Sequence, residues 1–143
     1  MTKATRKFSL ADIDTISACN KPFKLEIISA KTREPTGMFV YIVGKDSDVY
    51  RAKKDALANE WLAREAANAR RNKFEPESIS KLEAKNIDAI VAAITGWEGF
   101  AFNVDDPDLE FTDENIRMVC RKYPPFKEQV QEAINDLENF MVR

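Results

Sequence analysis

The chain has 143 residues, of which 44% are hydrophobic and 32% charged, so it is long enough to bury the core of one domain. This composition is typical of a globular protein, and no apolar run reaches the roughly 18–20 residues that cross a bilayer, so we expect a cytoplasmic protein. The chain contains no histidine, which excludes histidine-based catalytic triads and removes the commonest general base and metal ligand. Its two cysteines, Cys19 and Cys120, match no metal or redox spacing, so we expect two free thiols.

The net charge of −2 hides an uneven distribution of charge along the chain. Residues 1–85 hold 17 basic and 12 acidic side chains, whereas residues 86–143 hold 5 basic and 12 acidic ones. Ends of opposite charge could steer head-to-tail self-association or an oriented partner. The alternative is that both are ordinary solvated faces.

The chain divides into a leader and one domain. Residues 1–20 are predicted to be a basic, partly ordered leader, in which Ser9 could cap a short helical turn. Residues 21–143 are predicted to form a single α+β domain, mostly helical, in which an N-terminal β-hairpin packs on about four helices.

The hairpin is predicted over residues 23–43. Apolar and charged residues alternate from Phe23 to Ile28, which is the pattern of a strand with one buried face. Residues 38–43 are continuously apolar and indicate a better-buried strand, and the turn between the two contains Pro35 and Gly37. A lone hairpin is marginal in water, so we expect it to pack on helices or to gain strands from another copy.

A long helix is predicted next, over about residues 48–71. Asp46-Ser47-Asp48 favours its start, and the run that follows is rich in alanine and charged residues without glycine or proline. Its thin apolar stripe consists of Tyr50, Leu57, Trp61 and Leu62. Most of this helix should therefore be solvated or covered by a partner.

A second helix is predicted over about residues 76–95, with Pro76 at its first position and Gly96 ending it. It carries the strongest amphipathic pattern of the chain, so we expect it to be the central core helix. Its apolar face consists of Ile79, Leu82, Ile87, Ile90, Val91 and Ile94.

Two further helices are predicted over residues 112–123 and 125–142. Thr112 should cap the first, with acidic residues after it that complement the helix dipole. Pro124 should end that helix, and Pro125 should open the last one. The apolar residues on one face of the last helix are Phe126, Val130, Ile134, Leu137 and Met141.

The segment from Gly96 to Phe100 is the most informative part of the chain. Two glycines, Gly96 and Gly99, flank Trp97, so the backbone can turn sharply while a large aromatic side chain stays anchored. We expect Gly96, Trp97, Gly99 and Phe100 to fix a structural corner between helices. The alternative is that Trp97 and Phe100 form a protein-docking patch.

No segment predicts a catalytic, cofactor-binding or metal site. Four glycines cannot supply a nucleotide-binding fingerprint, and the acidic residues between 105 and 114 lack the register of a calcium loop. The basic run of residues 69–73, with Arg64, could contact phosphates. Its acidic neighbours and the attraction of cations to a helix C-terminus favour an ordinary helix end instead. We therefore expect a protein that is not an enzyme and needs no cofactor, with a small nucleic-acid-binding regulator as one alternative.

The order of these features resembles the tail assembly chaperones of long-tailed, siphovirus-like bacteriophages and prophages. The resemblance spans about residues 20–143. It rests on the strand pair, the long charged helix, the segment Ile94-Thr95-Gly96-Trp97-Glu98-Gly99-Phe100 and the segment Phe111-Thr112-Asp113-Glu114-Asn115. A proline-initiated helix with an aromatic residue near the C-terminus completes the pattern. The long Lys/Arg-rich helix and the basic leader depart from it.

The resemblance implies a virion-assembly protein of the host bacterial cytoplasm that acts through protein–protein interactions. Proteins of this family bind the long tape-measure protein, keep it soluble, help recruit tail-tube subunits, and are absent from the finished virion. A minor structural protein of the tail or head–tail junction is the alternative within the same gene cluster.

Self-association is a further expectation, through the exposed edge of the strand at residues 38–43 or through the last helix. The candidate residues are Phe39, Tyr41, Phe126, Val130 and Leu137. A homo-oligomer would satisfy the need of the hairpin for additional strands.

Overall fold

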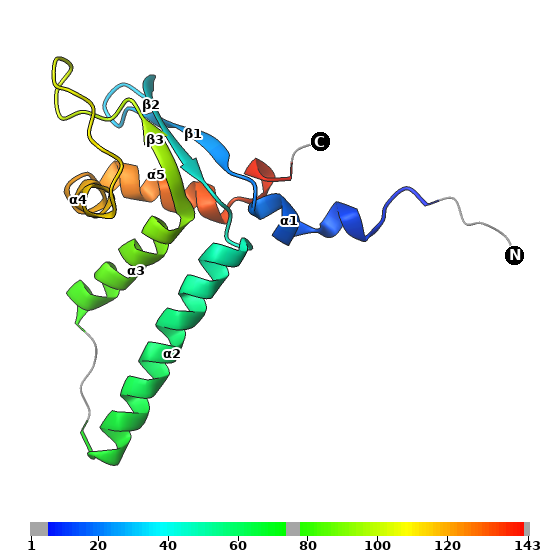
Figure 1. The fold of residues 1–143 in the computed structure, drawn as a ribbon, viewed down its shortest axis with the longest axis vertical. Helices are drawn as coiled ribbons and strands as arrows, with labels where there is room; N and C mark the ends of the chain where they lie inside the picture. The colour runs from blue at the N-terminus through cyan, green and yellow to red at the C-terminus, as the bar shows by residue number, and fades with distance from the viewer. Residues whose placement is uncertain (1–5, 74–77, 142–143) are drawn as a thin grey trace, which may run out of the picture.

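A computed structural model describes residues 6–73 and 78–141 of the chain (Figure 1). The helices are η1 (Leu10–Ile13), α1 (Thr15–Cys19), α2 (Asp48–Arg70), α3 (Ile79–Ala93), α4 (Asp113–Lys122), α5 (Pro124–Asn135) and η2 (Leu137–Asn139). The strands are β1 (Phe23–Ile28), β2 (Pro35–Ile42) and β3 (Ile94–Glu98). The predicted α+β fold, mostly helical with an N-terminal hairpin packed on helices, is confirmed.

The sheet has three antiparallel strands in the order β1-β2-β3, so the hairpin gains its third strand from its own chain. One row across the sheet pairs Leu25 with Val40 and Val40 with Trp97. Val40 and Ile42 are fully buried, whereas the alternate residues of β2 point to the other face. One face of the sheet therefore packs against the helices, and the three strands together bury enough apolar surface to be stable.

Strand β3 corrects the prediction that Gly96 ends the central helix. Helix α3 ends at Ala93, and Ile94 takes an extended conformation with φ −86° and ψ 122°. Gly96 lies within β3, opposite Tyr41 of β2. The chain leaves the helix early because β2 offers a pairing partner and because Ile94, Thr95 and Trp97 are residues that favour strands.

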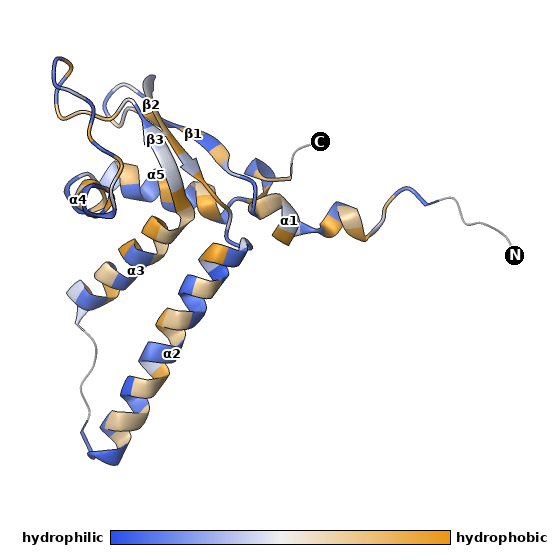
Figure 2. Ribbon diagram, in the orientation of Figure 1, coloured by the Kyte–Doolittle hydropathy of each residue, from blue (hydrophilic) through white to orange (hydrophobic). Residues whose placement is uncertain are grey.

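Helix α2 projects from the body, and α3 returns alongside it (Figure 1). Ser47 caps α2 as expected, because its Oγ accepts a hydrogen bond from the Tyr50 N–H at 3.3 Å. Apolar and polar residues follow one another along α2 without gathering into a broad stripe (Figure 2), and Tyr50 is its one buried residue. Ser78 caps α3 through the Lys81 N–H at 3.3 Å, and the predicted start at Pro76 lies outside the described residues.

Helices α4 and α5 close the core. The Thr112 Oγ1 accepts a hydrogen bond from the Asn115 N–H at 3.1 Å, which confirms the predicted cap. Helix α5 begins at Pro124 and ends at Asn135, which is shorter than predicted. It ends there because Asp136 adopts an extended conformation (φ −90°, ψ 101°) and its carboxylate caps the short turn η2.

The core gathers residues from every part of the domain. Its fully buried side chains include Val40, Ile42, Ile87, Ile90, Ile116, Val130 and Ile134. The leader joins it through Cys19, whose carbonyl accepts a hydrogen bond from the Gly44 N–H at 2.9 Å. In the described part of the chain, none of the helices combines the length and the apolar character that crossing a membrane requires.

Candidate protein-binding surface

Trp97 ties the end of β3 to the long loop that follows. Its indole Nε1–H donates a hydrogen bond to the Leu109 carbonyl at 3.1 Å. The ring centroid lies 4.8 Å from that of Phe100 and 5.6 Å from that of Phe111. Phe100 in turn meets Phe126 of α5 edge-on at 5.5 Å. The corner joins a strand to a loop, so the prediction of a corner between two helices is wrong about the elements that it connects.

The turn after β3 depends on Gly99. Its φ of +81° is unfavourable for residues with a side chain, and a Cβ atom there would lie 2.8 Å from the Gly37 carbonyl oxygen. Phe100 is buried, and Trp97 is half-buried beneath the loop. These contacts hold the segment in place and leave little of it for a partner, which favours the structural interpretation over the docking patch.

The predicted free edge at residues 38–43 is wrong, because β2 is the central strand and pairs on both sides. Phe39 and Tyr41 instead point to the outer face of the sheet and are half-buried there. The Lys24 Nζ lies 4.3 Å from the Phe39 ring centroid and 3.0 Å from a Glu98 carboxylate oxygen. The Tyr41 hydroxyl donates to the same Glu98 oxygen at 3.0 Å.

The contacts within this polar cluster shift the pKa values of Glu98 and Lys24. The hydrogen bond from Lys24 lowers the pKa of the Glu98 carboxyl, and the bond from Tyr41 lowers it further. The same contact with Glu98 raises the pKa of the Lys24 ammonium. Because Lys24 and Glu98 join the two edge strands across β2, the pair contributes to the order of the sheet.

The last helix does not offer the predicted self-association residues. Phe126 and Val130 belong to the buried core, and Leu137 is half-buried against it in η2. The apolar face of α5 is therefore covered by the core of its own chain. The edge of β2 and the apolar face of α5 are thus both used within the chain.

An exposed apolar surface lies on the arm, which we define as residues 57–70 of α2 and 79–86 of α3. Trp61, Leu62, Ile79 and Leu82 are between 47% and 84% exposed on it. Leu57, Trp61 and Leu82 line one hollow of about 380 Å³ between the two helices. Large apolar side chains at helical spacing on two adjacent helices form the kind of groove that binds an amphipathic helix.

The polar groups around this hollow could orient a partner. Lys54, Lys85 and Asn86 line it beside the apolar residues. The outer sides of the arm carry charges of both signs, among them Glu60, Glu65 and Arg70. An apolar floor with a charged rim is typical of reversible helix binding, because the floor provides affinity and the rim provides orientation.

Sequence reasoning placed Ile79 and Leu82 in the core, and the structure places them on the arm. The helical pattern of α3 is regular from Ile79 onward, but only its second half reaches the body. No local signal separates the two halves. One indication was present in the sequence: the apolar stripe of α2 is too thin to cover the apolar face of α3 completely.

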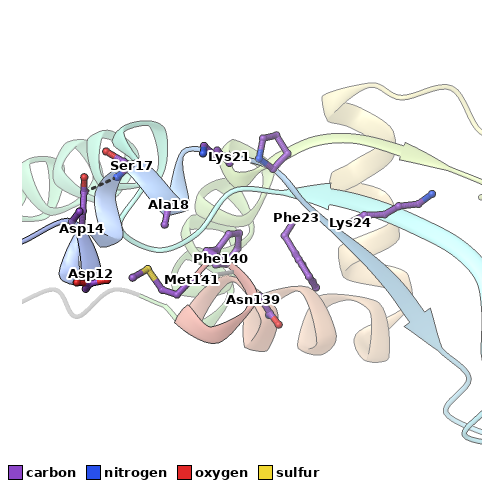
Figure 3. A pocket seen from close by; sticks show the side chains of 12 residues that line it. Asp12, Asp14, Ser17, Ala18, Lys21, Phe23, Lys24, Asn139, Phe140 and Met141 are labelled. Carbon is purple, nitrogen blue, oxygen red and sulfur yellow. Dashed lines mark hydrogen bonds between the residues drawn. The ribbon is translucent and has the colours of Figure 1, made fainter. Parts of the chain in front are cut away.

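A larger hollow of about 670 Å³ lies between the leader and the C-terminal turn (Figure 3). Several of its polar groups are already used by the fold. Asp14 accepts the Ser17 N–H at 3.0 Å, which lowers the pKa of its carboxyl, and the side chain of Lys24 points away toward Glu98.

The two thiols are buried and unpaired with each other, as expected of free cysteines. Burial raises the pKa of the Cys120 thiol to about 11 and also raises that of Cys19. Among the described residues, no three His, Cys, Asp or Glu side chains gather as metal ligands would.

Comparisons with models of protein families, with curated proteins and with solved structures found no match for this chain. The exposed apolar residues of the arm and the order of features along the sequence are therefore the two observations that point to a function.

Proposed function

We propose that this chain is a tail assembly chaperone of a long-tailed bacteriophage or prophage, and that it holds the tape-measure protein on its arm. The observation that carries the proposal is the group of exposed apolar side chains Trp61, Leu62, Ile79 and Leu82. A tape-measure protein is a long helical polypeptide whose apolar seams promote aggregation until the tail tube encloses them. An arm of two helices with an apolar floor is a suitable cover for such a seam.

The chaperone acts by binding rather than by catalysis and works in the host bacterial cytoplasm. It helps recruit tail-tube subunits and is absent from the finished virion. The charged sides of the arm keep the complex in solution.

Quantitative mass spectrometry of an assembling lysate and of purified particles from the same culture provides the first test. We expect the chain to be abundant in the lysate and lost from the particles. Retention at a fixed copy number would instead make it a minor structural protein of the tail or head–tail junction. Salt-sensitive binding to DNA would favour the nucleic-acid-binding regulator.

Variants of the arm test the binding surface directly. Trp61→Ser and Leu82→Ser should abolish co-purification of the tape-measure protein and return it to the insoluble fraction. Val49→Ser is the matched control, because Val49 is comparably exposed on α2 but lies outside the arm. All three changes affect exposed side chains and should alter stability little. Unchanged co-purification in both arm variants would refute the assignment of this surface.

A further inference from the structure

An apolar groove of about 360 Å³ lies at the end of the molecule opposite the leader. The end of β1, the start of β2, the loop after β3 and the α4–α5 junction enclose it. Its principal apolar side chains are those of Ile28, Met38, Phe102, Leu109, Tyr123 and Phe126. Ile28, Phe102 and Tyr123 are also among the exposed large hydrophobic residues, so the groove opens to solvent along an apolar rim.

Acidic side chains outnumber basic ones around this groove. The loop that supplies Phe102 and Leu109 also carries three aspartates, and a second hollow shares Ile28 and Pro125 with the groove. The acidic residues on the segments around it are Glu34, Asp105, Asp106, Asp108, Glu110, Glu128 and Glu132, and the basic residues are Lys31, Arg33, Arg121, Lys122 and Lys127. Lys127 is paired with Glu83 at 3.5 Å. Lys122 lies over the Phe102 ring at 5.1 Å, so part of its charge is already engaged.

The leader complements the groove in both respects, because it has exposed apolar side chains and basic residues. Phe8, Leu10 and Ile13 are between 71% and 81% exposed, so the fold gives their apolar side chains no partner. Arg6 and Lys7 precede them in the sequence. The one carboxylate of this stretch, on Asp12, accepts the Ser9 N–H at 2.7 Å and is used in holding the turn η1. The leader is thus a short basic segment with an apolar side.

Residues 6–13 lie far from the groove of their own chain in this structure (Figure 1). The leader is anchored where Cys19 enters the core, and from there β1 runs for six residues, or about 20 Å, before Ile28 reaches the groove. The leader points away from the body in the opposite direction (Figure 1). To reach that groove, the stretch from Asp14 back to Phe8 would have to reverse its direction and run along the whole of β1.

We propose that residues 6–13 of one copy of this chain dock into the apolar groove of a second copy. Phe8, Leu10 and Ile13 enter the groove, while Arg6 and Lys7 face its aspartates and glutamates. The two surfaces differ, so the contact is heterologous: one copy keeps a free groove and the other keeps a free leader, to which further copies can add. The contact is independent of the partner on the arm, which lies elsewhere on the molecule.

An eight-residue segment buries far less surface than a stable dimer needs, so the contact is weak and depends on concentration. Its charged component is exposed and therefore sensitive to salt. Raising the ionic strength from about 0.1 M to about 1 M shortens the screening length from about 10 Å to about 3 Å. We expect the average mass in solution to rise with protein concentration, and this rise to become smaller at high salt.

Sedimentation velocity of the full chain over a range of concentrations tests the proposal with two variants and one control. Leu10→Ser removes an apolar contact of the leader, and Phe102→Ser removes one of the groove. Each should weaken association about tenfold to a hundredfold. Val104→Ser is the control, because Val104 is fully exposed on the same loop but does not line the groove, and it should associate like the unaltered chain.

Mixing the two defective variants gives the decisive result. Leu10→Ser retains an intact groove and Phe102→Ser retains an intact leader, so together they should form a one-to-one heterodimer that grows no further. Three outcomes would overturn the proposal: a monomer at every concentration, association that neither variant weakens, or a mixture that stays monomeric. Circular dichroism of each variant establishes that a loss of association does not come from unfolding.

Discussion

Replacing Gly99 by alanine should destabilise the protein far more than the same change at Gly37. Both glycines have positive φ, +81° for Gly99 and +79° for Gly37. They differ in the space around a new methyl group. A Cβ at Gly99 would lie 2.8 Å from the Gly37 carbonyl oxygen, whereas a Cβ at Gly37 would have no atom within 4 Å. The pair therefore separates the cost of the backbone conformation from the cost of the clash.

The magnitudes follow from these two terms. A residue with a Cβ in the left-handed region costs about 1–2 kcal/mol, and the reduced freedom of the unfolded chain returns about 0.4–1 kcal/mol. Gly37→Ala should therefore lower the free energy of unfolding by about 1 kcal/mol. The clash at Gly99 involves backbone that cannot rotate away, so an overpacking cost of about 1–3 kcal/mol is added. Gly99→Ala should lower the free energy of unfolding by about 2–4 kcal/mol.

Urea unfolding, followed by circular dichroism and tryptophan fluorescence, measures both values. The slope of the free energy with urea should be unchanged in both variants, so that the midpoints report stability directly. Equal losses for the two variants would refute the reasoning, because they would show that the methyl group at Gly99 meets no resistance. A larger loss for Gly37→Ala would refute it as well.

Three further predictions concern other contacts. Trp97→Phe should lower the free energy of unfolding by about 1–3 kcal/mol, because it leaves the Leu109 carbonyl without its donor, and urea unfolding measures the loss. Cys120, with a thiol pKa of about 11, should react with a thiol reagent at neutral pH only after unfolding, and rapid labelling of the native protein would contradict this. Glu98→Gln tests pH dependence. Because the pKa of the Glu98 carboxyl is lowered in the folded state, its contribution is full above the ordinary carboxyl pKa of about 4.3 and is lost as pH falls through the lower folded value. The stability difference between the Gln variant and the unaltered chain should therefore shrink on acidification, and a difference that stays constant down to strongly acidic pH would contradict the assignment.

The features that the sequence predicts well are those set by neighbouring residues. Ser47 and Thr112 cap helices through the backbone three residues ahead, and the alternating pattern of residues 23–28 needs no distant partner to be recognised. Each of these predictions depends on a few consecutive side chains, and each is confirmed.

The features that it does not predict depend on distant partners. Residues 94–98 become a strand because β2, about 50 residues earlier, pairs with them, and no local pattern reveals such a partner. The same is true of Val130 and Ile79, which lie on equally regular apolar faces. One is buried and the other exposed, and only the packing of whole helices decides which.

The pairing of Ile42 with Ile94 has a consequence for how the arm can vary. These two residues are neighbours in the sheet, so everything between them leaves and re-enters the body at one place. Tyr50 and the second half of α3 belong to the core, whereas the outer part of the arm contributes no buried residue to it. Because a longer loop costs little additional closure entropy, turns of helix can be added to or removed from both halves together without disturbing the sheet. The length of the arm can thus change while the stability of the rest of the domain stays the same.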